Sequence, residues 1–145
     1  MRGRSPHLRR VAVAALVSAL APALLGCGTL DRDAVQSELQ SIESASAEGS
    51  LVAHEVERDR TLRSFAVIRT AELHKQAENA SEALQETPPE QGLESSAKRG
   101  VVLGDRASSL IERLHNSPTD RAVAHDVRLK LDRIAGDAGD LADAL

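Results

Sequence analysis

The side chains best suited to bind a metal ion are four histidines that follow the first 26 residues. They are His54, His74, His115 and His125. No two of them are three or four positions apart, so one helix face cannot present a histidine pair. We therefore expect surface or boundary histidines. The alternative is a site assembled from two helices, with His54 or His74 beside His115 or His125.

Glu112 and His115 have the Glu-x-x-His spacing, which places a carboxylate and an imidazole on the same helix face. This spacing is used in ferritin-like di-iron bundles, which need two such motifs and two further inward glutamates. The sequence contains no second Glu-x-x-His. It therefore does not predict a di-iron centre, and Glu112 stays a candidate only for an assembled site.

Ser95 and Lys98 match the Ser-x-x-Lys spacing of penicillin-interacting enzymes, in which the lysine activates the serine. The other motifs of those enzymes are absent, and the chain is far too short for their fold. The sequence offers no other nucleophile, acid–base pair or phosphate-binding loop. We therefore expect no catalytic residues and no enzymatic activity.

Cys27, the only cysteine, follows a segment typical of a secretory signal peptide. Residues 1–10 contain four arginines and no acidic residue, and residues 11–25 are almost entirely apolar or small. A helix of that apolar length spans roughly 22 Å, less than the roughly 30 Å of a bilayer core. A cleaved export signal over residues 1–26 is favoured over a permanent membrane span.

The end of this segment, Leu24-Leu25-Gly26-Cys27, resembles the lipobox of bacterial lipoproteins. The resemblance covers residues 1–27. It implies a diacylglyceryl group on the Cys27 sulfur, cleavage between Gly26 and Cys27, and usually an acyl chain such as palmitate on the new amino terminus. The alternative is an ordinary signal peptide, which would leave one unpaired thiol exposed to oxidation.

The lipoprotein interpretation predicts a location on the extracytoplasmic face of a bacterial membrane. Two or three acyl chains anchor a protein stably, whereas one does so only marginally. Residues 27–30 then form a short tether of at most roughly 10 Å. The folded domain, residues 31–145, is expected close to the membrane. We expect no cofactor other than the covalent lipid.

The charge balance argues against nucleic-acid binding. Removal of residues 1–26 takes away four of the 18 basic residues and none of the 22 acidic ones, which leaves a net charge of −8. Such a domain is repelled by phosphate backbones. It has no Trp or Tyr and one Phe, so it lacks aromatic platforms for stacking bases.

The hydrophobic spacing predicts helices throughout the domain, of about 17, 35, 27 and 28 residues. Asp31 caps the first, which runs to about Ala47, and Glu48-Gly49-Ser50 predicts its end. The second runs from Leu51 to about Gln85. Its apolar stripe changes phase between Thr61 and Ser64, which leaves open whether the helix breaks there.

Two proline-containing segments predict the starts of the third and fourth helices. Thr87-Pro88-Pro89-Glu90 combines a hydroxyl cap, a proline in the first turn and a glutamate three residues after the cap. Asn116-Ser117-Pro118-Thr119-Asp120 repeats this signal. The stripes that follow are Leu93, Ala97, Gly100, Gly104, Ala107, Ile111 and Leu114, then Ala124, Val127, Leu131, Ile134, Ala138, Leu141 and Leu145.

The middle of the third stripe is almost bare of side chains, because it contains Gly100 and Gly104 between two alanines. Two glycines in a helix cost about 1 kcal/mol each relative to alanine, so a packing gain should offset them. We predict close helix packing against larger residues such as Leu129, Leu131 or Ile134. The alternative is a pocket or a docking groove for another protein's helix.

Long amphipathic helices with short connections predict an all-α, antiparallel up-down bundle of three to four helices. In general character the domain resembles the uncharacterised small helical lipoproteins of high-GC Gram-positive bacteria, a resemblance that brings no functional residues with it. We expect a structural or protein-interaction role, with another envelope protein as partner. The alternative is a carrier or sensor of a metal or small ligand in the bundle core.

Overall fold

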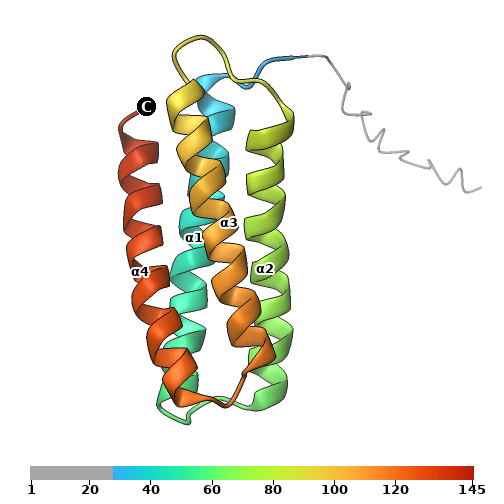
Figure 1. Ribbon diagram of the computed structural model, residues 1–145, viewed down its shortest axis with the longest axis vertical. Coiled ribbons are helices and arrows are strands. Elements are labelled where there is room, and N and C mark those ends of the chain that lie inside the picture. The colour runs from blue at the N-terminus through green and yellow to red at the C-terminus, as the bar shows by residue number, and fades with distance from the viewer. Residues whose placement is uncertain (1–27) are drawn as a thin grey trace, which may run out of the picture.

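Four α-helices form an up-down bundle in the computed structural model, which describes residues 28–145 (Figure 1). They are α1 (Arg32–Glu57), α2 (Arg63–Glu86), α3 (Glu94–Asn116) and α4 (Arg121–Asp143). Each helix packs against the next, and α4 returns to pack against α1. The predicted all-α bundle is confirmed, with four helices and no strand among the described residues.

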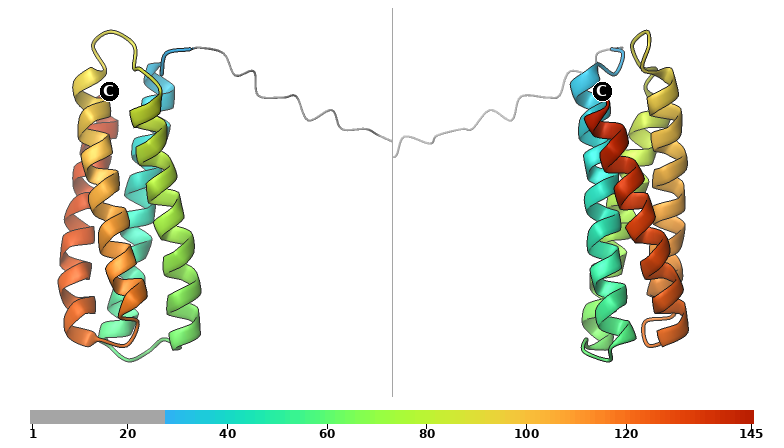
Figure 2. Two further views of the ribbon diagram at one scale, coloured as in Figure 1. Left: turned by 45° about the vertical axis from the view of Figure 1, so that its right-hand side comes forward. Right: turned by 90° about the vertical axis from the view of Figure 1, so that its left-hand side faces the viewer.

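The two ends of the bundle differ in what they carry (Figures 1 and 2). Residues 28–31, the α2–α3 connection and the C-terminal residue lie at one end, which we call the proximal end. The α1–α2 and α3–α4 connections lie at the other, the distal end. Residues 1–27, which contain the predicted signal peptide and Cys27, lie outside the described residues.

The core follows the predicted apolar stripes. The stripe of α3 has seven positions, from Leu93 just before the helix to Leu114, and all of them are buried. The stripe of α4 is buried from Ala124 to Leu141. Leu145, the last predicted position, is half-buried and packs against the core. Spacings of three and four residues thus located the buried face of both helices correctly.

The predicted end of the first helix at Glu48-Gly49-Ser50 is wrong. α1 continues through these residues to Glu57, and Gly49 is buried in its middle. A Cβ atom at Gly49 would lie 3.0 Å from Leu131 Cδ1 and 3.3 Å from Ile111 Cγ1. The glycine is there because side chains of α3 and α4 approach the α1 backbone, and it does not terminate the helix.

The open question of a break near residues 61–64 is answered by the turn between α1 and α2. Residues 58–62 form this turn, in which Asp59 has a φ of 57°. Asp tolerates this left-handed conformation better than most residues. α2 begins at Arg63 after Leu62, so Ser64 lies inside the helix and does not cap it.

The predicted helix start at Thr87–Glu90 is also wrong. Thr87 is the C-cap of α2, and α3 begins only at Glu94. Between them Leu30 lies beside Pro89: its N–H donates to Pro88 O at 2.9 Å, and its carbonyl accepts from Glu90 N at 2.9 Å. This contact with the chain before α1 holds the two prolines in an extended connection.

The observed start of α4 lies close to the predicted one. Asp120, within the predicted start signal, is the N-cap, and its Oδ1 accepts from the backbone N–H groups of Ala122 and Val123 at 2.9 and 3.0 Å. Pro118 lies before the helix, which is shorter at both ends than the predicted 28 residues.

Close helix packing at the α3 glycines is confirmed, but with other partners. A Cβ at Gly100 would lie 2.6 Å from Leu84 Cδ1, and one at Gly104 would lie 2.8 Å from Ser81 Cβ. The predicted partners on α4 are wrong, and Leu129 is exposed. The glycines instead bring α3 against α2 and, diagonally, against Leu39 and Ile42 of α1.

Candidate functional site

Two of the candidate histidines connect α2 to α3. His115 Nδ1 lies 3.1 Å from both Thr70 Oγ1 and the Val67 carbonyl oxygen. His74 Nδ1 donates to the Ser108 carbonyl oxygen at 3.1 Å. Thr70 is fully buried, so the His115 contact supplies a partner for a polar group inside the bundle.

The other candidates lie elsewhere. His125 is exposed on α4 and pairs with Glu57 at 2.8 Å, whereas His54 is half-buried near the end of α1. Glu112 is exposed on α3. Residues 28–145 contain no group of three or more His, Cys, Asp or Glu side chains placed to hold a metal ion. No such group of three or more therefore includes any of these five residues.

Glu57 has two basic partners at the distal end of the bundle. Its two carboxylate oxygens accept from His125 Nδ1 at 2.8 Å and from Arg128 Nε at 2.9 Å. These hydrogen bonds, the His125 bond first, lower the pKa of Glu57 from its ordinary value. The cluster joins α1 to α4 and has the character of a structural ion pair.

Ser95 and Lys98 do not form a nucleophile–base pair. Both side chains are exposed in the first turns of α3, and within the described chain no hydrogen bond joins them. They line a shallow surface hollow that also contains Arg99 and Val102. The Ser-x-x-Lys spacing here reflects two neighbouring surface positions on a helix.

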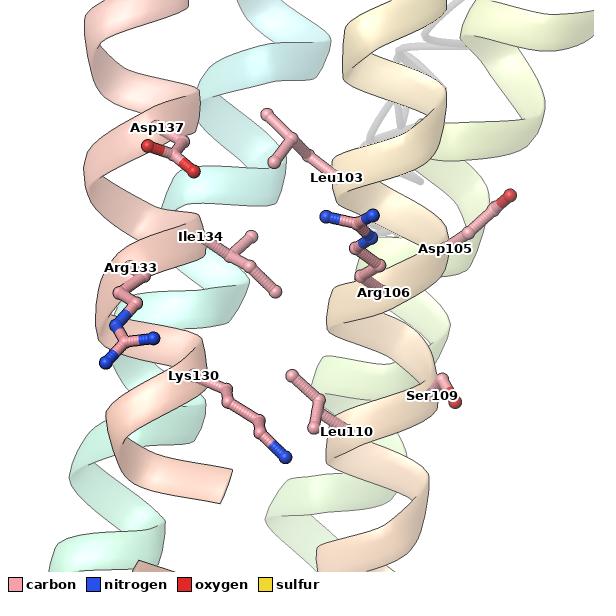
Figure 3. Close-up of a pocket in the computed structure, with 9 residues that line it drawn as sticks. All are labelled: Leu103, Asp105, Arg106, Ser109, Leu110, Lys130, Arg133, Ile134 and Asp137. Atoms are coloured by element: carbon pink, nitrogen blue, oxygen red, sulfur yellow. The ribbon is translucent and has the colours of Figure 1, made fainter. Parts of the chain in front are cut away.

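A hollow lies on the surface between α3 and α4 (Figure 3). We call it the α3/α4 groove; its volume is about 570 Å³. Its lining residues are Leu103, Asp105, Arg106, Ser109 and Leu110 of α3 and Lys130, Arg133, Ile134 and Asp137 of α4. Leu103, Leu110 and Ile134 point into the space between the two helices and form an apolar floor (Figure 3).

Basic side chains surround this apolar floor. Arg106 extends from α3 toward α4, and Lys130 extends from α4 toward α3 (Figure 3). Lys130 Nζ also pairs with Asp126 Oδ2 at 2.8 Å, and that bond, followed by one from Arg113, lowers the pKa of Asp126. Arg133 adds a third cation at the α4 side of the groove.

No sequence pattern predicted the groove residues as a site. A signal was present within α3, because Arg99 and Arg106, and likewise Leu103 and Leu110, are seven positions apart and share a helix face. What the sequence could not show is that this face lies beside Lys130 and Arg133. That requires the pairing and register of α3 and α4.

The predicted alternative of a pocket along the small residues of α3 is excluded by their packing. Gly104 faces Ser81 and the Ala77 carbonyl oxygen, and Gly100 faces Leu84 and Leu39, at distances too short even for a methyl group. The groove lies on another face of α3, toward α4.

No helix in the described range is both long and apolar enough to cross a membrane. Comparison with known proteins finds no matching family model, no matching curated protein and no matching solved structure. Function must therefore be argued from the residues and their geometry.

Proposed function

We propose that this protein is a lipid-anchored component of a bacterial cell envelope, on the extracytoplasmic face of the membrane, that acts through contacts with another envelope protein. The anchoring rests on the sequence before the bundle: a basic start, a short apolar stretch and Leu24-Leu25-Gly26-Cys27. The helical surfaces offer no catalytic arrangement that would favour an enzyme.

The observation that carries this proposal is the position of Leu30. Its two backbone hydrogen bonds to the α2–α3 connection fix the chain three residues after Cys27. Only Gly28 and Thr29 lie between, so Cys27 and Leu30 are at most about 10 Å apart. A lipid on Cys27 would therefore hold the proximal end of the bundle against the membrane and direct the distal end away from it.

The distal half of the bundle offers apolar side chains for a protein partner. Six large hydrophobic side chains are exposed among residues 28–145. Four of them belong to the last turns of α1, the adjoining turn and the first turns of α2: Leu51, Leu62, Phe65 and Ile68. Phe65, the only aromatic residue, is 56% exposed. Exposed apolar residues concentrated in one region are typical of protein contact sites.

Metabolic labelling tests the anchor. The full chain is expressed in a bacterial host with an alkyne-bearing palmitate, beside a Cys27→Ser variant. We expect label on the wild-type protein and its partition into the detergent phase of Triton X-114. The variant should carry no label. Label that persists on the variant, or an unlabelled wild-type protein, would refute lipidation at Cys27.

Site-specific photo-cross-linking tests the interaction role separately. A photoreactive amino acid is placed at Phe65, with Val102 of α3, an exposed apolar position in the proximal half of the bundle, as the control. We expect a discrete cross-linked adduct in living cells at position 65 and none at position 102. Identical patterns at both positions would contradict a contact surface at the distal end.

A further inference from the structure

The α3/α4 groove has the size and lining of a small-molecule site. Its volume of about 570 Å³ lies within the range of roughly 300–1,000 Å³ that is usual for ligand sites. Such sites combine apolar walls with a few polar groups that fix orientation. Here Leu103, Leu110 and Ile134 supply the apolar surface.

The groove also concentrates positive charge in an acidic domain. The groove and the hollow that adjoins it through Leu103 and Arg106 are lined by five of the basic residues and two of the acidic ones. The basic residues are Lys98, Arg99, Arg106, Lys130 and Arg133. The domain as a whole has 22 acidic residues and a net charge of −8 without residues 1–26.

Two acids line the groove, Asp105 and Asp137, and among residues 28–145 neither makes an ion pair with a basic residue of the groove. Asp105 lies on the side of α3 away from α4 (Figure 3), where it accepts a hydrogen bond from Ser81 Oγ. Within residues 28–145, neither Arg106 nor Arg133 makes an ion pair with a carboxylate. Both guanidinium groups therefore retain free donors for an anionic ligand.

The apolar floor is elongated along the helices. Leu103 and Leu110 are seven residues apart on α3, which corresponds to about 10 Å. Ile134 faces them from α4 (Figure 3). An aliphatic chain lying between the helices would contact all three side chains, with an anionic headgroup beside Arg106. Arg133 extends away from α3 in Figure 3, so its side chain would rotate toward the groove to bind the headgroup.

From this combination we propose that the α3/α4 groove binds a single-chain anionic amphiphile. The aliphatic chain lies on Leu103, Leu110 and Ile134, and a phosphate or carboxylate headgroup binds Arg106 and Arg133. This inference does not depend on lipidation at Cys27. Nine residues line this groove, whereas a stable protein interface takes about 20–30 residues from each partner, so the groove suits one such chain better than a protein.

Titration calorimetry on residues 28–145 tests the proposal, because this segment contains all four helices and their core. The probe is dodecyl phosphate below its micelle-forming concentration. Dodecyl maltoside supplies a chain without charge, and inorganic phosphate supplies charge without a chain. We expect saturable one-to-one binding of dodecyl phosphate and binding at least about tenfold weaker for each control, because both parts of the site are needed.

Paired variants locate the site. Arg106→Gln with Arg133→Gln should weaken dodecyl phosphate binding by at least about tenfold, because each removes a charged donor. The matched control, Arg60→Gln with Arg63→Gln, removes the same charge at the distal end and should change affinity less than about twofold. Leu110→Ser, at a half-buried position, should weaken binding without abolishing the cooperative thermal melt.

Three results would overturn the proposal. The first is no saturable binding of monomeric dodecyl phosphate. The second is equal weakening by the two double variants, which would indicate attraction by overall charge alone. The third is binding to vesicles with anionic lipid but not to the monomeric amphiphile, which would assign the basic groove to a membrane surface.

Discussion

Gly104 shows how tightly one residue constrains the packing of three helices. A Cβ at this position would lie 2.8 Å from Ser81 Cβ, 3.2 Å from Ile42 Cδ1 and 3.3 Å from the Ala77 carbonyl oxygen. Ser81 Cβ and the Ala77 carbonyl oxygen are held by the α2 backbone, so they cannot rotate away. A larger residue requires α2 and α3 to separate.

Gly104→Ala should therefore destabilise the bundle by about 1–3 kcal/mol, although alanine alone favours helix formation. Gly136→Ala on α4 is the matched control, because a Cβ there meets nothing within 4 Å. It should stabilise the protein by about 0.5–1 kcal/mol. Urea unfolding of both variants measures these changes. A stabilising Gly104→Ala would show that the helices can separate at little cost.

The lowered pKa of Glu57 predicts a pH dependence of stability. Because hydrogen bonds from His125 and Arg128 favour the ionised form, the folded pKa lies below the unfolded one. The stabilisation is present at pH values above the unfolded pKa and is lost as the pH falls through the folded pKa.

Between pH 6 and pH 3 the thermal midpoint should therefore fall more in the wild type than in Glu57→Gln. Glu112→Gln is the control, because within the described chain Glu112 makes no ion pair. It should follow the wild-type profile. Parallel profiles for the wild type and Glu57→Gln would contradict a stabilising role for this cluster.

At the scale of single elements, the buried faces of the helices were predictable and two of their boundaries were not. The three- and four-residue spacing of α3 and α4 marks the core because it depends only on helix geometry. Gly49 and Pro88-Pro89 misled the prediction because their roles depend on distant residues. Leu131 and Ile111 require the glycine, and Leu30 holds the prolines outside α3.

The candidate site residues also depend on distant residues, which the sequence pattern does not reveal. Histidine and Glu-x-x-His spacings identify residues that share a helix face, but the partners of those residues come from other helices. His115 pairs with Thr70 and His125 with Glu57, so each imidazole has a local structural partner. The α3/α4 groove was missed for the same reason, since its two walls are 20 or more residues apart in the chain.

The N-cap of α4 gives a prediction at this scale. Asp120→Ala removes the acceptor of two backbone N–H groups and should lower the free energy of unfolding by about 1 kcal/mol. Asp120→Asn keeps an oxygen acceptor, so it should lower the free energy of unfolding much less. Urea unfolding of both variants measures the two changes in the free energy of unfolding. Equal losses would mean that the charge of Asp120, and not its capping geometry, stabilises α4.

At the scale of the whole molecule, the bundle is a rod with chemically different ends. α1 alone contains 26 residues, which gives a length of about 39 Å. The backbone contact of Leu30 lies at the proximal end, whereas Phe65 lies in α2 near the distal end. An anchor ahead of residue 28 would orient this rod.

This orientation can be measured on vesicles. Residues 27–145 are coupled through Cys27 to a maleimide lipid, and energy transfer to a headgroup dye is recorded from a fluorophore at Gln91 or at Thr61. Gln91 in the α2–α3 connection should show strong transfer, and Thr61 in the α1–α2 turn should show weak transfer. Equal transfer from both positions would mean that the bundle lies along the surface.

The backbone contact of Leu30 with Pro88 and Glu90 also has a mechanical consequence. Tension applied to the chain ahead of residue 28 reaches Leu30 before it reaches α1. The two hydrogen bonds pass part of that load to the connection between α2 and α3. Pulling on the N-terminal side therefore loads three helices together, and the first helix is not peeled from the bundle alone.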